Sequence, residues 1–433
     1  MRTSLRVGAV VAAAALALTT AACSSGGTNT DSGPVKLTYW AWAPNMDKVA
    51  AIWNASHKDI QVVVNKQDGG DAAVTKLLTA VKAGSGAPDI MQAEYQKIPT
   101  LVSANALVDL KDQGAADLKS EFTPGTWNAV TLGGSSVYAI PQDSGPMMFY
   151  YRRDVFQELG LTAPKTWDEY AADARTIAQK KPGSFLGTFS SGDPGWFAGL
   201  AQQAGASWWG IDGKAWTVNI DSAATKKVAD YWGGLVKEGA IDNTPMYTPA
   251  WNTALNNGTQ VGWVSSVWGP GVLAGNAANT QGKWAAAQLP NWDASKPSNG
   301  NWGGSSTAVT AQSKHAKQAM EFIKWLNTDP KAVKALAQIA NIYPADVNAP
   351  KVALDTPPAF FADQSDFYAV AAKASKNVSN FTYGPNVNVA YSAYTDAFAK
   401  AAEAKDPAQF DAALTTMQDT TKSDLVKAGF TVK

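Results

Sequence analysis

The chain has 433 residues, with 36 basic and 36 acidic side chains, 17 tryptophans and one cysteine. A domain usually holds about 50 to 250 residues, so this length predicts two domains. The even charge balance argues against a nucleic-acid surface, which needs a basic stripe. Because charged residues make up only 17% of the chain, folding depends on hydrophobic burial, and the many tryptophans call for an explanation.

The N-terminus has the pattern of a cleaved export signal. Two arginines come before an apolar run at 7–18, which is too short to span a bilayer, and small residues lead to Cys23. This pattern resembles the lipobox of bacterial lipoproteins, although Thr20 stands where an aliphatic residue is usual. We expect a lipoprotein signal peptide at 1–22, lipidation of Cys23 and a flexible tether at 23–34. An ordinary secretory leader with an incidental cysteine is the alternative.

The first part of the mature chain alternates strands and helices. Strands are predicted at 35–42, 60–65 and 88–93, with helices at 44–57 and 71–83 between them. Asp71 is predicted to cap the second helix and Gly84 to end it. Alternation of this kind implies parallel strand pairing.

The stretch at 137–170 organises the rest of the chain. Two short apolar runs, 137–140 and 147–151, read as strands on either side of a proline-bounded polar link. A short helix ended by Gly160 follows, and Thr166 opens the next helix with capping-box spacing to a glutamate. We interpret this stretch as a crossing of the chain from one lobe to another.

Helices dominate the remainder of the sequence. Further helices are predicted at 167–180, 196–206, 222–238, 316–326, 330–339, 360–375, 389–405 and 407–428. Strands are predicted at 261–267 and 284–289, and a break at 269–271. A glycine pair at 303–304 leads into a strand and the helix with the motif FIKWL, and Tyr343 marks a third crossing.

This order of elements, with the motif AGSGAPDIMQAEY at 83–95, resembles the extracellular solute-binding proteins, in the family of the maltose-binding protein. The resemblance implies an α/β, two-lobed periplasmic-binding-protein fold of the type II kind. Each lobe would be a mostly parallel sheet flanked by helices, with three interlobe crossings. It also implies a first lobe at 35–142 and 306–348 and a second lobe at 143–305 and 349–433.

No catalytic or metal-binding motif is found in the sequence. There is no nucleophile elbow and no phosphate-binding loop, and two histidines make no metal cluster. A glycosidase needs two facing carboxyl groups. Glu94, Asp143 and Glu169 could be considered for that role, but Glu169 is better explained as a helix cap. We therefore expect a protein that is not an enzyme and has no cofactor and no metal.

The tryptophans suggest a sugar site. A sugar ring has apolar C–H faces and polar edges, so an indole can stack on its face while polar groups bind its rim. Four tryptophans on apolar helix faces are predicted to be core: Trp53, Trp167, Trp232 and Trp325. Seven others lie at element ends, where either core packing or ligand contact is open: Trp40, Trp42, Trp208, Trp209, Trp251, Trp268 and Trp302.

The family places its ligand contacts at the end of the first strand, the exit of the third strand, the crossings and loops of the second lobe. Carried over by position, the resemblance nominates as ligand-binding residues Trp40, Trp42, Glu94, Tyr95, Asp143, Trp268, Trp302, Gly303, Gly304 and Tyr343. Trp196 and Tyr383 remain open, and 68–70 is read as a plain turn.

The function we expect is that of a substrate-binding lipoprotein of an ABC transporter, which captures a neutral sugar or oligosaccharide between two lobes. Its partners would be the oligosaccharide and ABC permease subunits, with no nucleic acid, and it would act as a monomer anchored outside the cell membrane. One alternative is a secreted carbohydrate-active enzyme with a similar cleft. Another is the same fold binding a peptide, amino acid or polyamine, which the low charge content disfavours.

Overall fold

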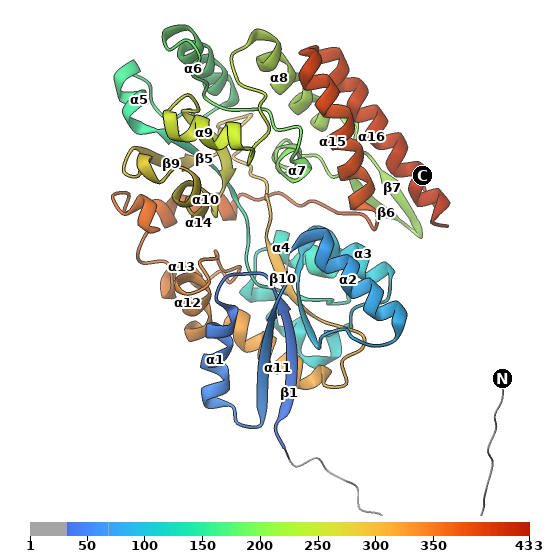
Figure 1. Ribbon diagram of the computed structural model, residues 1–433. Helices are drawn as coiled ribbons and strands as arrows, with labels where there is room; N and C mark the ends of the chain where they lie inside the picture. Colours follow the sequence, from blue (N-terminus) through green and yellow to red (C-terminus); the bar gives the residue numbers. More distant parts are fainter. Residues whose placement is uncertain (1–32, 68) are drawn as a thin grey trace, which may run out of the picture.

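The computed structural model describes residues 33–67 and 69–433, which form two lobes joined by several chain segments (Figure 1). Cys23 and the predicted signal peptide at 1–22 lie outside these residues. In the described part of the chain no helix has the length and apolar character needed to cross a membrane.

The first lobe is built on a five-stranded sheet in the order β2-β1-β3-β10-β4. Its strands are β1 (Val35–Ala41), β2 (Ile60–Lys66), β3 (Ile90–Glu94), β4 (Ile140–Pro141) and β10 (Ser305–Val309). Strand β1 pairs in parallel with β2 and β3, whereas β10 runs antiparallel to β3 and β4. The sheet is flanked by α1 (Met46–Ser56), α2 (Gly70–Ala83), α3 (Ile98–Ser103), α4 (Pro124–Thr131), α11 (Ala316–Thr328) and α12 (Pro330–Gln338).

Helix α1 shows how the apolar pattern produces this packing. Its buried residues recur at helical spacing and place the ring of Trp53 5.6 Å from Phe322 and 5.4 Å from Trp325 of α11. The next helix differs from the prediction, because its N-cap is Gly69 and Asp71 lies inside it. Gly84 ends α2 in the left-handed conformation, as predicted.

The second lobe has a three-stranded sheet in the order β8-β5-β9. Strand β5 (Met147–Arg152) pairs antiparallel with both β8 (Gly262–Ser266) and β9 (Trp284–Gln288). The prediction of mostly parallel sheets is therefore wrong for this lobe and holds only for β1, β2 and β3 of the other. A separate hairpin, β6 (Trp209–Asp212) and β7 (Ala215–Val218), was not predicted.

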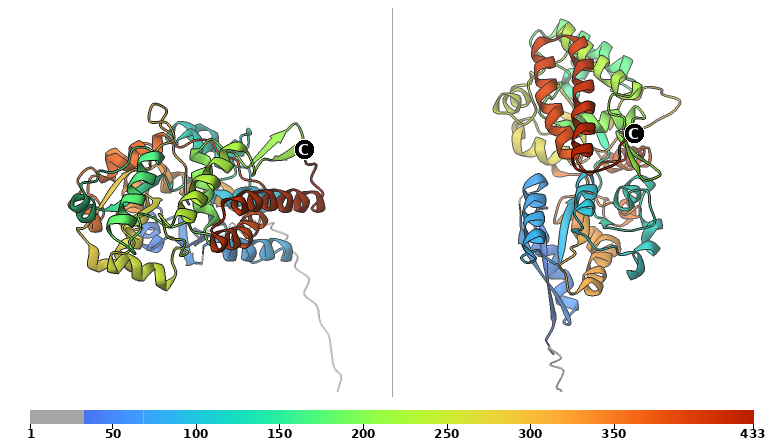
Figure 2. Two further views of the ribbon diagram at one scale, coloured as in Figure 1. Left: turned by 90° about the horizontal axis from the view of Figure 1, so that it is seen from above. Right: turned by 90° about the vertical axis from the view of Figure 1, so that its right-hand side faces the viewer.

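Helices surround this second sheet. They are α5 (Arg153–Leu159), α6 (Trp167–Lys180), α7 (Pro194–Gln203), α8 (Ala223–Glu238), α9 (Pro249–Asn257), α10 (Gly269–Asn276), α14 (Phe367–Lys376), α15 (Val387–Ala404) and α16 (Pro407–Lys427), with α13 (Ala349–Val352) beside the third crossing. Figure 2 shows α15 and α16 side by side on one flank of the lobe. As predicted, Thr166 caps α6 by accepting the Glu169 N–H at 3.1 Å. The break predicted at 269–271 is instead the first turn of α10, where a proline fits without losing a hydrogen bond.

Three crossing segments join the lobes and lie hydrogen-bonded to one another. The backbone N–H of Ser144 in the first crossing donates to the carbonyl of Tyr343 in the third, at 3.0 Å. The N–H of Trp302 in the second crossing donates to the carbonyl of Gly145 at 2.8 Å. A Cβ atom on Gly145 would lie 2.2 Å from the Trp302 carbonyl oxygen, so only glycine permits this approach. The expected three crossings are confirmed.

The buried apolar side chains form two separate clusters. One draws on residues between 37 and 140 and between 308 and 345. The other draws on residues between 147 and 302 and between 333 and 425. Because the crossings fall between these clusters, we propose the lobe boundaries expected from the sequence.

Candidate functional site

A cavity of about 220 Å³ lies where the lobes meet. It is lined by Glu94, Gln96, Asp193, Pro194, Gly195, Trp302, Gly303, Tyr383 and Tyr391. Glu94 ends β3 and Gln96 follows it in the first lobe, whereas the others come from the second lobe and the second crossing. An occupant of this cleft cavity would therefore touch both lobes at once.

Asp193 places a carboxylate in the cleft cavity. It is the N-cap of α7 and accepts the backbone N–H of Trp196 at 3.0 Å, with Pro194 at the first helical position. The side chain of Trp302 also hydrogen-bonds to this carboxylate. Burial raises the pKa of Asp193 to about 6, although these hydrogen bonds lower it in part. At neutral pH the group is an ionised acceptor held in a fixed orientation.

Trp302 forms an aromatic wall of the cleft cavity. Its ring meets that of Trp268 edge to face with centroids 4.7 Å apart, and its side chain is only 7% exposed. The next residue, Gly303, has a φ of 81°, and a Cβ atom there would lie 3.3 Å from the Trp268 Nε1 atom. The glycine lets the backbone turn against the indole, which fixes the position of this wall.

Two tyrosines on the second-lobe side supply hydroxyl groups. The side chains of Tyr383 and Tyr391 are hydrogen-bonded to each other. Burial raises the pKa of Tyr383 to about 12, and the negative charge of Glu94 adds to this shift. Burial likewise raises the pKa of Tyr391. Both phenols are neutral at physiological pH and can donate or accept hydrogen bonds.

The lobes contact each other beside the cleft cavity. Lys97, which is 4% exposed, donates from Nζ to Oδ1 of Asn388 on α15 and lies 5.9 Å from the centre of the Tyr391 ring. The Thr100 hydroxyl donates to the carbonyl of Pro385 at 2.8 Å. These contacts join η1 (Tyr95–Lys97) and α3 of the first lobe to the second lobe.

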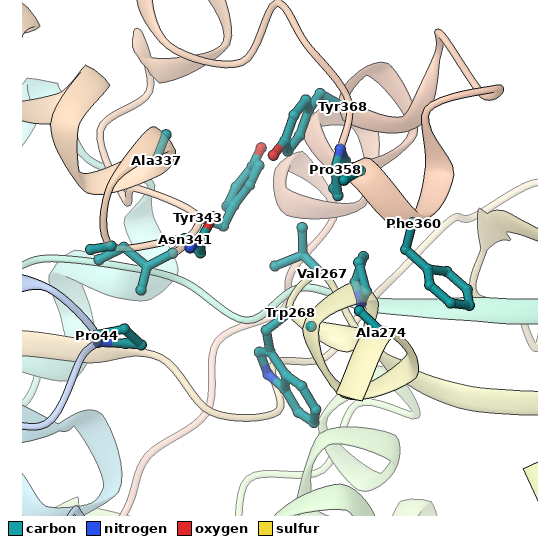
Figure 3. A pocket seen from close by; sticks show the side chains of 15 residues that line it. Pro44, Val267, Trp268, Ala274, Ala337, Asn341, Tyr343, Pro358, Phe360 and Tyr368 are labelled. Carbon is teal, nitrogen blue, oxygen red and sulfur yellow. The ribbon is translucent and has the colours of Figure 1, made fainter. Parts of the chain in front are cut away.

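A larger cavity of about 480 Å³ lies on the other side of Trp268 and also lies between the lobes (Figure 3). Its lining is mainly apolar and includes Pro44, Val267, Trp268, Tyr343, Phe360 and Tyr368. The rings of Tyr343 and Tyr368 are stacked with centroids 6.4 Å apart, and Figure 3 shows their phenol oxygens pointing toward each other. The cleft thus has a polar compartment and an apolar compartment, with Trp268 and Trp302 between them.

Comparison with known proteins identifies the family. The sequence profile described as bacterial extracellular solute-binding protein matches residues 37–333. The chain belongs to this family. The arabinooligosaccharide-binding protein of Halalkalibacterium halodurans is 23% identical over 78% of this chain and 76% of its own length. The lactose-binding protein of Rhizobium radiobacter is 28% identical over 73% of this chain and 74% of its own length.

Solved structures of similar proteins show the same two-lobed fold. The galacto-N-biose-/lacto-N-biose I-binding protein of Bifidobacterium longum, in complex with lacto-N-biose, is 30% identical with a TM-score of 0.82, over 93% of this chain and 99% of its own. A binding protein of B. animalis subsp. lactis in complex with β-1,6-galactobiose is 27% identical with a TM-score of 0.77, over 93% of this chain and 100% of its own. The function of this chain is accordingly to bind a solute.

The sites predicted for this solute-binding protein fall in several places. Glu94, Trp302 and Gly303 line the cleft cavity, and Trp268 and Tyr343 line the larger cavity. Trp40 and Trp42 line neither cavity. The Trp40 ring instead packs under the Nζ atom of Lys76 at 4.5 Å, and the Trp42 N–H donates to Gln92 at 3.1 Å.

The other nominated residues build the crossings. The Tyr95 hydroxyl donates to the Asp143 carbonyl at 2.7 Å. The Asp143 carboxylate accepts the N–H and the hydroxyl of Ser305, each at 2.7 Å. Gly304 has a φ of 97°, and a Cβ atom there would lie 2.8 Å from the Tyr95 ring. These three residues therefore hold the first and second crossings together and line neither of the two cavities.

The tryptophans at element ends do not all lie in the cleft. Trp208, Trp209 and Trp251, for which core packing and ligand contact were both left open, are exposed by only 0%, 2% and 0% and are core residues. Trp196, which was left open, is core and donates to the Val264 carbonyl at 3.2 Å. Of the predicted core residues, Trp53, Trp167 and Trp232 are confirmed, whereas Trp325 is only partly buried.

Sequence reasoning missed several lining residues, namely Gln96, Asp193, Pro194, Gly195 and Tyr391. The available signal for Asp193 was its position before a proline, which is typical of a helix N-cap. That pattern predicts a helix start but not which cavity the carboxylate faces. Tyr391 lies within the apolar pattern of α15 and carried no distinguishing signal.

Proposed function

We propose that this solute-binding protein captures a neutral sugar or oligosaccharide in the cleft cavity. The observation that carries the proposal is the combination of one indole wall with carboxylate, amide and phenol groups from both lobes. An indole offers a flat apolar surface for the C–H face of a sugar, while the polar groups can bind its hydroxyls. The sugars in the names of the similar proteins support this ligand class.

Ligand contacts on both lobes give the mechanism of capture. A sugar bound to Glu94 on one side and to Asp193 and Trp302 on the other stabilises the closed arrangement relative to an open one. We propose that the closed form is what the permease subunits of an ABC importer recognise. Recognition of this kind releases the sugar unchanged, and the protein acts as a monomer.

A titration tests the sugar assignment. We expect tryptophan fluorescence to change, and the melting temperature to rise, with at least one of arabinobiose, lactose, lacto-N-biose and β-1,6-galactobiose, because a ligand of the native state stabilises it by mass action. No response to any of these sugars, together with a response to an amino acid or polyamine, would overturn the proposal. Chromogenic glycosides and product analysis test the enzyme alternative, since a binding protein leaves its ligand intact.

We further propose that Cys23 is lipidated and anchors the protein to the extracytoplasmic face of the cell membrane. The proposal is supported by the lipobox-like sequence and by membership of a family of extracellular binding proteins. Mass spectrometry of the mature N-terminus is expected to show an acylated cysteine. The Cys23→Ser variant should be released from the membrane fraction, and retention of that variant in the membrane would contradict the anchor.

A further inference from the structure

Tyr247 combines two unusual properties. The residue is 42% exposed, although its side chain is a large aromatic group, and its backbone φ is 66°. The left-handed region is costly for residues other than glycine and, to a lesser degree, asparagine. Of the described non-glycine residues with positive φ, three are asparagines, and Tyr247 is the one aromatic residue. Strained residues of this kind are concentrated at binding and catalytic sites.

Contacts on both sides of Tyr247 hold it in this conformation. The backbone N–H of the preceding Met246 donates to the Ser190 hydroxyl at 3.1 Å. The following Thr248 is the N-cap of α9 and accepts the N–H of Trp251 at 3.3 Å. These hydrogen bonds hold the backbone on both sides of Tyr247 and so keep its φ positive.

The ring of Tyr247 adjoins the wall of the cleft cavity. Its centroid lies 6.3 Å from that of Trp302 and 5.5 Å from that of Trp251. Burial raises the pKa of the Tyr247 phenol, and the negative charge of Asp193 raises it further, so the phenol is electrostatically coupled to a carboxylate of the cavity. The ring packs on indoles beside the cavity, and the residue as a whole keeps 42% of its surface exposed.

The cleft cavity is too small to enclose a whole oligosaccharide. At about 220 Å³ it is smaller than the roughly 300 to 1,000 Å³ of sites that enclose a drug-sized ligand. A cavity of this size suits one sugar ring, and further rings of an oligosaccharide must extend beyond it. The neighbouring Tyr247 offers an aromatic surface for such an extension.

We propose that Tyr247 is a specificity-determining residue that stacks on the second unit of an oligosaccharide whose first unit occupies the cleft cavity. This inference rests on the proposed sugar function. It assigns the protein a preference for disaccharides and longer sugars over monosaccharides. The aromatic surface beside Trp302 provides that preference without adding a charge.

The test compares one monosaccharide with disaccharides that contain it. Lactose, lacto-N-biose and β-1,6-galactobiose are titrated calorimetrically, and galactose, which all three contain, is measured by displacement of the tightest disaccharide. We expect Tyr247→Ala to weaken disaccharide binding by roughly ten- to thirtyfold and galactose binding by less than about twofold. Tyr247→Phe, which keeps the ring, should retain most of the affinity.

Two glycine variants separate the ring contact from backbone strain. Tyr247→Gly and Lys405→Gly each relieve a positive φ, of 66° and 51°, but Lys405 is exposed at the end of α15. Lys405→Gly should keep or raise the melting temperature, and Tyr247→Gly should melt above Tyr247→Ala, which loses the same ring contacts with Trp251 and Trp302 but keeps the strain. Only the Tyr247 variants should lose disaccharide affinity. Equal weakening of galactose and disaccharide by Tyr247→Ala, or no weakening of either, would overturn the inference. If the unmodified protein bound none of these sugars, the proposed function would fail first and this inference with it.

Discussion

The indole N–H of Trp268 donates a hydrogen bond to the backbone carbonyl oxygen of Trp302 at 2.8 Å, while the two rings meet edge to face. Trp302 lines the polar cleft cavity, and Trp268 lines the larger apolar cavity. Because Trp302 belongs to the second crossing, the pair couples the wall of the candidate sugar site to a segment that joins the lobes. A change in either ring should therefore affect ligand binding through the other.

Removal of the Trp302 ring should weaken sugar binding directly. Trp302→Ala deletes the indole wall of the cleft cavity and the side-chain hydrogen bond to Asp193. We expect a loss of about 1 to 3 kcal/mol in binding free energy. Isothermal titration calorimetry with the tightest-binding disaccharide measures this loss.

Trp232→Ala is the matched control. Its indole is 1% exposed in the core of the second lobe, packed 4.9 Å from Trp196, and lines neither cavity. We expect this variant to lose about 3 to 5 kcal/mol of unfolding free energy with its sugar affinity preserved. An unchanged affinity in Trp302→Ala, or an equal loss of affinity in both variants, would show that the indole wall does not contact ligand.

Protonation of Asp193 should weaken sugar binding in acid. Its pKa is raised to about 6 by burial, so the carboxylate is ionised at pH 7 and mostly protonated at pH 5. A hydrogen bond from a sugar hydroxyl favours the ionised form, so affinity is present above the pKa and falls as pH drops through 6. Asp193→Asn should lose about 1.5 to 3 kcal/mol of binding free energy at pH 7.

The pH profile distinguishes a ligand contact from a purely structural cap. Asparagine is as good an N-cap as aspartate, so α7 should remain intact in Asp193→Asn. The affinity of this variant should be nearly constant between pH 5 and 7 when measured by fluorescence titration. A variant that retained the pH dependence of the unmodified protein would assign the titration to another group.

The sequence predicted where the chain segments of the cleft lie better than it predicted which side chains line it. Glu94 was nominated at the exit of the third strand and Trp302 in a crossing, and both line the cleft cavity. Trp209 was left open between core packing and ligand contact because it lies at the end of an element. A Cβ atom on Gly384 would lie 2.3 Å from the Trp209 ring, so a glycine distant in sequence is what allows this indole to pack against backbone. Such contacts are set by tertiary structure and leave no local pattern.

Strand direction was likewise beyond the local sequence. Alternation of strands with helices correctly implied the parallel pairing of β1 with β2 and β3. Strand β5, by contrast, pairs with β8 and β9, which lie more than a hundred residues away along the chain. An apolar run predicts a buried strand but carries no information about the direction of such distant partners.

Asp143 should make the stability of the protein depend on pH. Burial raises its pKa from 3.8 to about 6, although two hydrogen bonds from Ser305 oppose the shift. Because the native-state pKa is higher than the unfolded value, its stabilising contribution is complete below about pH 4 and is lost as pH rises through 6. Asp143→Asn removes this titration. It should gain on the order of 1 to 3 kcal/mol relative to the unmodified protein between pH 4 and 7.

Urea unfolding at several pH values measures the Asp143 effect. Asp193 and Asp173 also have a pKa raised to about 6, so the difference between the two proteins, rather than either curve alone, isolates Asp143. A difference in unfolding free energy that stays constant from pH 4 to 7 would contradict the expected titration.

The contact between Lys97 and Asn388 should stabilise the closed arrangement of the lobes. The Lys97 ammonium group hydrogen-bonds across the lobe boundary and lies over the Tyr391 ring. Lys97→Met keeps much of the side-chain length but removes the charge and the donor. We expect the ligand-free Lys97→Met variant to open, with a larger radius of gyration in small-angle X-ray scattering, and its sugar affinity to fall by about 1 to 2 kcal/mol.

Lys82→Met, on the exposed face of α2, is the matched control and should change neither the radius of gyration nor the sugar affinity. A saturating disaccharide should return the scattering curve of Lys97→Met to the compact form of the unmodified protein. If Lys97→Met lowered affinity but left the scattering curve unchanged, the lysine would act on the ligand and not on the contact between the lobes.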